Sequence, residues 1–340
     1  MSHGRHAGST NVWSYACSAC GKCCNSAPPL SLPELFYHQH QFIGCLAVRR
    51  IRRPRVGVWI GMAAEKRPAE SNDCLAFDEL ARMLFHRPAN ARDSDFFVLL
   101  AAQGLDVPGT RQCPMLRPDA RCLLHSDHKP AACVAVPLDP LVPDRWQNLV
   151  LAERQRDADF SGAGCIAKGS GRDLLPIVRN GQVLRSDLLS ALGQRRADLA
   201  NEKRLWGKAA YTLLERSLTG QPDGLAQIPD NGQLIMSLVP TLLVLAEVSA
   251  RCHERCIDFI EAQLTLIQRV SNGLALEELT AQASRARLLS FSRAYSTLQR
   301  ALRNEQRMRN PRSIDPEPAE VEAWLESKSR NQPMLAGARS

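Results

Sequence analysis

Apolar residues recur at helical spacing through most of the second half of the chain. Residues 187–218, 233–271 and 276–305 each repeat them every three to four positions, which predicts amphipathic helices. The longest apolar run, 234–248, contains Pro240 and Glu247 and is too short and too interrupted to cross a bilayer. We therefore expect a buried helix there and no membrane span.

Before residue 186 the predicted helices are shorter. Ser31-Leu32-Pro33-Glu34 is a capping box with proline in the first turn, and it predicts a helix through about Phe42. A second helix is expected over 77–85, started by Asn72 or Asp73, and a third over 95–103 that ends at Gly104.

Proline and turn residues limit what the rest of the first half can form. Seven prolines between Val107 and Pro143 exclude a continuous helix, so the cysteines of this segment are expected on loops or short strands. Farther on, two β-prone arms flank Asn180-Gly181, a pair typical of a type I′ hairpin turn.

Together these patterns predict a mainly α protein with a change of character near residues 175–185. Ten of the twelve cysteines lie before residue 170. Residues 1–175 are expected to form an irregular, cysteine-rich metal-binding domain with a few helices and a small β-hairpin. Residues 176–305 are expected to form an α-helical domain, and 306–340 a loose tail with one short helix.

Charge and composition add little about partners. The formal net charge is +8, and the most basic run, RRIRRPR at 49–55, has no interleaved aromatic residues for stacking bases. Nucleic acid is therefore not the expected partner, and a solvated edge or a contact with an acidic protein is favoured. The first residues lack the apolar stretch of a secretory signal, which predicts a cytoplasmic protein. In that compartment, clustered cysteines are metal ligands or redox groups more often than disulfides.

The first cysteine cluster is CSACGKCC, residues 17–24. Its x2-x2 spacing lets Cys17, Cys20 and Cys23 turn inward around one centre, as in the loops that hold four-iron clusters. The adjacent Cys24 points elsewhere, and Ala27 occupies the position of the fourth ferredoxin cysteine, so a ferredoxin is not supported. Two adjacent thiols are explained if two centres share one loop.

A second set of thiols follows much later in the chain and comprises Cys113, Cys122, Cys133 and Cys165. Four plus four thiols could complete one cluster and one further metal, or two tetrahedral sites. His125 and His128 are possible substitutes for a thiolate. A single zinc held by four cysteines is the simpler assignment, but it leaves about four cysteines unexplained.

The combined pattern resembles the CxxCxxCC family of zinc- or iron-chelating proteins, also called YkgJ-type cysteine-cluster proteins. The resemblance covers roughly residues 10–170, from the quartet to the segment CPML…RCLLH…HKPAACVAVP. It implies as metal ligands Cys17, Cys20, Cys23, Cys24, Cys113, Cys122 and Cys133, and less directly Cys165. Some members of this family resemble flagellin lysine N-methylases, which implies protein lysine methylation and flagellin as a partner.

Three classes of function follow from these observations. An enzyme would use the metal centre in chemistry such as lysine methylation, a scaffold would use it only to hold loops, and a carrier would exchange electrons or the metal itself. We expect a metal-binding protein with an iron–sulfur cluster, a four-iron cluster being favoured, and a structural zinc scaffold as the alternative. The sequence does not identify catalytic residues or the oligomeric state.

Two other stretches have a structural explanation that we favour. Cys252 and Cys256 share one face of a helix with Leu245, Val248 and Phe259, which predicts buried packing. The glycine-rich stretch 160–171 would suit a cofactor loop only if a strand preceded it and a helix followed.

Overall fold

The computed structural model describes residues 11–88, 96–107, 112–125, 128–169, 171, 173–219, 224–225, 227–274, 279–305 and 317–328. About 49% of the chain is helical and 17% is in strands, so the fold is mixed and helix-rich. Two compact units are present, and each is assembled from three separate segments. The first unit comprises Met1–Cys23, Arg53–Met83 and Leu116–Ala197, and the second Cys24–Arg52, Leu84–Met115 and Asp198–Ser340.

The first unit contains a four-stranded antiparallel sheet in the order β6-β1-β7-β8. Its strands are β1 (Val12–Tyr15), β6 (Ile166–Lys168), β7 (Leu175–Arg179) and β8 (Gln182–Val183). Trp13, Leu151 and Ile177 lie at the centre of its core and are at most 1% exposed. The hairpin between β7 and β8 is confirmed, because Asn180 and Gly181 adopt φ values of 50° and 79°, as a type I′ turn requires.

The first unit also contains short strands and helices around a buried carboxylate. They are β3 (Trp59–Gly61), β4 (Lys66–Pro68), α2 (Ser71–Leu84, its last residue in the second unit), α3 (Ala131–Ala135), the 3₁₀ turn Asp144–Trp146, α4 (Gln147–Ser161) and most of α5 (Ser186–Glu202). Asp73 accepts hydrogen bonds from Arg67, from the Trp146 indole and from the Glu70 amide. Burial raises the pKa of Asp73, but these hydrogen bonds together lower it by more than burial raises it. The pKa of Asp73 therefore lies below its usual range. The predicted helix start near Asp73 is confirmed.

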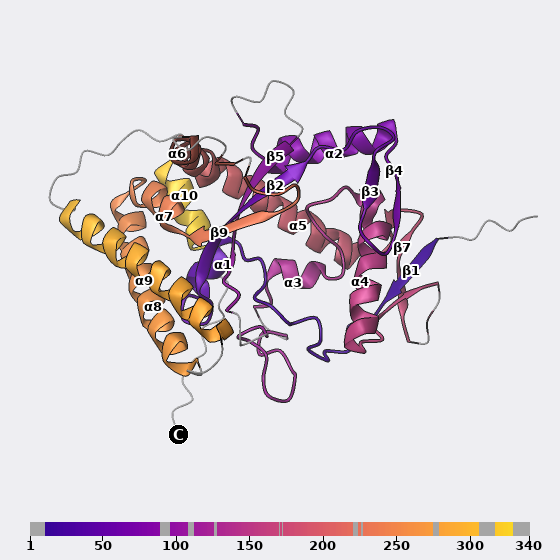
Figure 1. Ribbon diagram of the computed structural model, residues 1–340, viewed down its shortest axis with the longest axis horizontal. Coiled ribbons are helices and arrows are strands. Elements are labelled where there is room, and N and C mark those ends of the chain that lie inside the picture. The colour runs from indigo at the N-terminus through magenta and orange to yellow at the C-terminus, as the bar shows by residue number, and fades with distance from the viewer. Residues whose placement is uncertain are drawn as a thin grey trace, which may run out of the picture. The chain divides into compact units, whose positions relative to one another are not determined.

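The second unit is built on a three-stranded antiparallel sheet in the order β5-β2-β9 (Figure 1). Its strands are β2 (Gly44–Arg52), β5 (Phe96–Gly104) and β9 (Gln233–Ser237). A helix was predicted over 95–103, and for residues 96–103 this prediction is wrong. Residue 95 lies outside the described part of the chain. Residues 98–102 are buried without interruption, and an apolar run with no period does not distinguish strand from helix. Pairing with β2 along nine residues decides the outcome.

Helices from several parts of the chain complete the second unit. They are α1 (Leu32–Tyr37), the π-helical turn Lys203–Gly207, α6 (Lys208–Thr219), α7 (Val239–Ala246), α8 (Ala250–Gly273), α9 (Leu279–Glu305) and α10 (Pro318–Leu325). The capping box at Ser31 is present with both of its hydrogen bonds, although α1 ends five residues earlier than expected. The apolar run 234–248 divides into β9 and α7, so the single helix predicted there is wrong. The predicted tail helix is confirmed as α10.

Two buried polar side chains connect the long helices to the start of β2. Gln263 of α8 accepts a hydrogen bond from the Gly44 amide at 2.7 Å and donates to the carbonyls of Gln39 and Phe42. Tyr295 of α9 donates to the Gly44 carbonyl at 2.9 Å. Both side chains are fully buried, so these bonds fix how α8 and α9 meet the sheet. None of the helices in the described ranges has both the length and the apolar composition needed to cross a membrane.

Candidate metal centre

Strand pairing in the first unit brings Cys165 next to the beginning of the cysteine loop. β1 ends at Tyr15, which pairs antiparallel with Ile166 of β6. The residue after β1 therefore lies beside the residue before β6, and the Ala16 amide donates to the Cys165 carbonyl at 3.1 Å. Cys17 and Cys165, separated by about 150 residues of sequence, thus lie just outside the same end of the sheet.

The loop from Cys17 to Cys23 has no regular secondary structure and is held by contacts on two sides. A Cβ atom on Gly21 would lie 2.4 Å from the Ala120 carbonyl oxygen and 2.8 Å from Leu116 Cδ1, so only glycine fits. The Gly21 φ of 69° also favours glycine. On the other side, Lys22 Nζ donates to the Gly162 carbonyl at 2.7 Å. The loop therefore packs against the segment that leads to Cys122.

Four thiols of this region interact electrostatically. The pKa of Cys165 is raised by burial and then by the neighbouring thiols of Cys20, Cys23 and Cys17. The pKa of Cys20 is lowered, because its sulfur accepts hydrogen bonds from the Lys22 amide and the Ser18 hydroxyl. Cys17 and Cys23 are exposed, whereas Cys20 and Cys165 are half-buried. These four side chains form what we call the thiol group of the first unit.

Tyr15 lies at the base of the thiol group, and the sequence analysis did not single it out. Its ring belongs to the core of the first unit and is 8% exposed. Burial raises its pKa above the usual range, and a hydrogen bond with Cys17 and the charges of Cys17, Cys23 and Cys165 add to this effect. The only sequence signal is its position, directly before the cysteines in the strand VWSY.

The other predicted ligands divide between the two units. Cys122 forms an isolated β-bridge with Leu116. It follows by two residues Ala120, whose carbonyl lies against Gly21. Cys133 lies in α3, which corrects the expectation of a loop or strand. In the second unit, the Cys113 amide donates to the Cys24 carbonyl at 2.8 Å. Cys113 is buried, and Cys24, Cys122 and Cys133 are half-buried.

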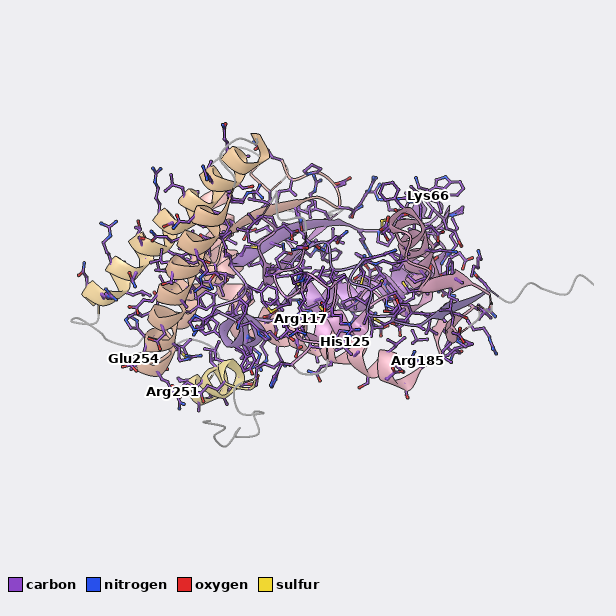
Figure 2. The ribbon with its side chains drawn as sticks, turned by 90° about the horizontal axis from the view of Figure 1, so that it is seen from below. Lys66, Arg117, His125, Arg185, Arg251 and Glu254 are labelled. Atoms are coloured by element: carbon purple, nitrogen blue, oxygen red, sulfur yellow. The ribbon has the colours of Figure 1, made fainter. Side chains whose placement is uncertain are left out.

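The two candidate histidines are not buried in a site. His125, labelled in Figure 2, is exposed, and His128 is half-buried with a φ of 53°. Neither belongs to the thiol group described above.

The donor chemistry of the thiol group suits a soft metal, but its side chains do not converge on one metal position. Soft thiolates select zinc, copper(I) and iron–sulfur clusters, and all twelve cysteines of the chain, each within the described ranges, are thiols rather than disulfides. Within those same ranges, no three His, Cys, Asp or Glu side chains converge closely enough to hold one metal ion. The eight-cysteine ligand set therefore stays a prediction.

Other sequence features have structural roles. Cys252 and Cys256 are at most 1% exposed in α8, as predicted. Gly162 ends α4 with a φ of 69°, and β6 follows it. A helix followed by a strand is the reverse of the order that a nucleotide-binding loop requires, so the described part of the glycine-rich stretch does not form that motif.

Comparison with known proteins gives no relative. No family model, curated protein or solved structure matches the chain. The resemblance to the CxxCxxCC family, which rests on the cysteine pattern, stays a prediction.

Proposed function

We propose that this chain is a metal-binding cysteine-cluster protein and that Cys17, Cys20, Cys23 and Cys165 bind an iron–sulfur cluster. The observation that carries the proposal is the pairing of β1 with β6, which fixes Cys165 beside the loop that contains the other three thiols. Their mutual influence on the pKa of Cys165 supports the same grouping.

The x2-x2 spacing of Cys17, Cys20 and Cys23 is the spacing of loops that hold four-iron clusters, and it favours a cluster over a single zinc ion. A zinc ion needs four sulfurs about 2.3 Å from one point. A four-iron cluster is a larger body, so it holds its cysteines farther apart while still using four thiolates. Cys20 is suited to this role, because hydrogen bonds to its sulfur stabilise the thiolate.

Cys24, Cys113, Cys122 and Cys133 are the candidates for further metal ligands. Cys122 and Cys133 belong to the first unit, and Cys122 follows the segment on which Gly21 packs. Cys24 and Cys113 belong to the second unit and are joined there through their backbones. This division supports the earlier explanation of two adjacent thiols, in which Cys23 and Cys24 serve different centres.

The decisive experiment is metal and sulfide analysis of anaerobically purified protein, together with its visible spectrum. We expect iron and acid-labile sulfide in equal amounts and a brown protein. Cys20→Ser and Cys165→Ser should lose the colour. Cys74→Ser is the matched control, because Cys74 is half-buried and its thiol bonds only weakly to the Pro54 carbonyl, a bond that a serine hydroxyl can keep. A colourless protein with stoichiometric zinc would instead support the scaffold alternative.

Protein lysine N-methylation is a further proposal that rests on the family resemblance. It is tested by incubating the metal-loaded protein with labelled S-adenosylmethionine and flagellin as the lysine-bearing acceptor. Label on flagellin that disappears with Cys20→Ser would support an enzyme. No transfer from fully loaded protein would leave a scaffold or a carrier.

A further inference from the structure

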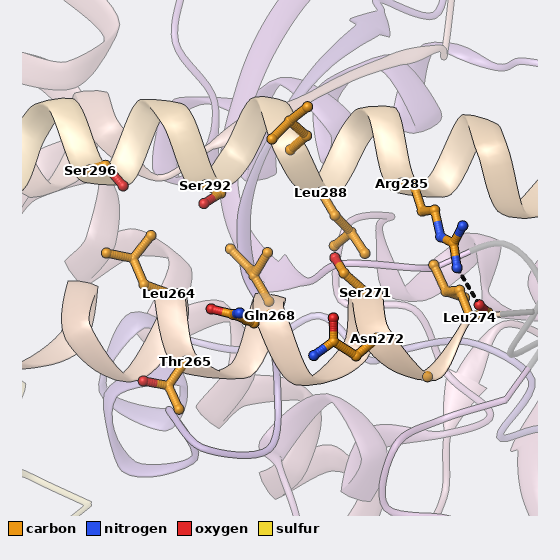
Figure 3. A pocket seen from close by; sticks show the side chains of 13 residues that line it. Leu264, Thr265, Gln268, Ser271, Asn272, Leu274, Arg285, Leu288, Ser292 and Ser296 are labelled. Carbon is orange, nitrogen blue, oxygen red and sulfur yellow. Dashed lines mark hydrogen bonds between the residues drawn. The ribbon is translucent and has the colours of Figure 1, made fainter. Parts of the chain in front are cut away.

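A groove runs between α8 and α9 in the second unit, and none of the predicted metal ligands is among the described residues that line it. Its volume is about 1160 Å³. Figure 3 shows the two helices side by side, with Leu264 and Gln268 of α8 facing Ser292 and Ser296 of α9. The groove spans 264–274 of α8, which at 1.5 Å per residue is about 15 Å, or three helical turns.

The groove has an apolar floor and small polar walls. Ile267 and Leu288 on the floor are buried, at 3% and 1% exposed. Ser292 and Ser296 lie one helical turn apart on α9, and Ser271 lies on α8. Because these serines are small, α8 and α9 leave a trough on their outer side instead of closing it. A trough of this shape, apolar at the bottom and three turns long, has the form that receives one amphipathic helix.

Arg285 is the one charged side chain among the described residues that line the groove. The helical stretches 262–274 and 279–304 contain six arginines, and the acidic residues that adjoin these stretches are Glu261, Glu277, Glu278 and Glu305. At the far end of the groove, Glu261 already pairs with Arg303. Arg285 lines the groove and donates to the Leu274 carbonyl, as Figure 3 shows.

Helical geometry puts two further arginines beside the groove. Arg293 and Arg300 follow Ser292 and Ser296 by one and four residues, so they flank the lined face of α9. The Arg300 Nε atom donates to the Ser296 carbonyl. Arg287, by contrast, lies about 160° around the helix from the groove-lining Arg285 and about 140° from Arg300, on the side away from the groove. Arg287, Arg293 and Arg300 are all exposed.

Other occupants fit the groove less well. No aromatic side chain lines it, and single-stranded nucleic acids rely on aromatic rings to stack their bases. Small-molecule sites enclose most of their ligand, whereas this groove is open to solvent.

We propose that the groove between α8 and α9 binds an amphipathic helix of another protein, apolar on the face that enters the groove and acidic along its edges. The apolar face would cover Ile267 and Leu288, and the acidic edge would face Arg285, Arg293 and Arg300. This inference is independent of the proposed metal centre.

The test uses the full chain and a fluorescein-labelled peptide of 18 residues. The peptide carries leucine at positions spaced three and four apart and glutamate on both sides of this stripe. Two control peptides have the same leucines with lysine in place of glutamate, or the same composition in scrambled order. Fluorescence anisotropy should report saturable binding of the acidic helix, weakened by salt, and little binding of either control.

Variants of the protein then locate the site. Exposed ion pairs are worth about 0.2–1 kcal/mol each, so Arg293→Gln with Arg300→Gln should weaken binding roughly 2- to 30-fold. Arg287→Gln removes the same charge from the opposite side of α9 and should leave the affinity unchanged. Ser292→Trp should block the groove, with circular dichroism showing that the fold is kept.

Three results would overturn the proposal. They are failure of the acidic peptide to bind, equal binding of the scrambled peptide, and an Arg287→Gln variant that loses as much affinity as the double variant. Displacement of the peptide by a single-stranded RNA of mixed sequence would also overturn it, since the groove would then be a nucleic-acid site.

Discussion

At the scale of single residues, the buried aromatic side chains carry chemistry that the cysteine pattern does not reveal. Tyr15 stays neutral beside the thiol group, because burial raises its pKa above the usual value of about 10. A neutral phenol beside a thiolate is a hydrogen-bond donor. Outer groups that donate to ligand sulfurs tune a metal centre without binding the metal.

If the thiol group binds metal as proposed, Tyr15→Phe should keep the fold and the metal but change the properties of the centre. The ring still fills its place in the core, and only the hydroxyl beside Cys17 is lost. We expect faster transfer of metal to a chelator, on the order of tenfold, and a shift of the visible absorption. Tyr37→Phe in the second unit is the control. An unchanged spectrum and release rate for Tyr15→Phe would show that the hydroxyl has no role.

His86 should make the protein sensitive to mild acid. Burial, and then the charge of Lys203, lower its pKa to about 4, and its ring stacks on Tyr211 with centroids 4.7 Å apart. In the unfolded chain His86 has a pKa of about 6.5, so below this pH it is protonated there while it stays neutral in the folded protein. Stability should therefore fall as the pH drops from about 6.5 towards 4, by on the order of 2–3 kcal/mol.

His86→Phe separates this effect from general acid unfolding. The phenyl ring can keep the stacking on Tyr211 but cannot be protonated. The free energy of unfolding in urea, measured at pH 7 and pH 4.5, should fall less in the variant than in the natural protein. Equal losses in the two proteins would mean that other groups are responsible.

At the scale of elements, the sequence predicted the caps and turns that are set by residues close together in the chain. The capping box at Ser31 and the turn at Asn180-Gly181 each act over two to four positions, and both are present. β5 and β9 were missed because their apolar residues pair with β2, up to about 190 positions away. The grouping of Cys17, Cys20 and Cys23 could also be predicted, because it follows from their x2-x2 spacing. The position of Cys165 could not, because it depends on the pairing of β1 with β6.

Gln263→Leu should weaken the attachment of α8 to the sheet. The substitution leaves the Gly44 amide and the carbonyls of Gln39 and Phe42 without this partner in a buried place. We expect a loss of about 3 kcal/mol in the free energy of unfolding, measured by denaturant titration. Gln268→Leu, five residues along the same helix and exposed, should change stability by less than about 0.5 kcal/mol. A loss at Gln263 no larger than at Gln268 would contradict this account.

At the scale of the whole molecule, loops that carry thiols should depend on metal for their order. The segments 16–24 and 112–130 contain no helix and little strand among their described residues, so they bury little surface to offset their conformational entropy. Metal binding would supply part of the missing free energy.

Cys20→Ser, or treatment with a chelator, should therefore make these segments sensitive to protease. Limited proteolysis with mass spectrometry should show new cuts within 16–24 and 112–130, while the rest of the second unit, including α8 and α9, stays resistant. Cys74→Ser should behave as the natural protein does. If Cys20→Ser loses metal and keeps its resistance, the metal does not stabilise the fold and a catalytic role becomes the better explanation.

The pairing of β1 with β6 also has a consequence for synthesis on the ribosome. The first three thiols are made about 140 residues before Cys165 and β6. At a synthesis rate of roughly 5–20 residues per second, Cys165 and β6 are made about 7–28 s after the first three thiols. During this interval the nascent chain presents CSACGKCC without its sheet. If these thiols bind a cluster as proposed, a cell that makes this protein must keep them reduced, and free of the wrong metal, until translation has passed residue 168.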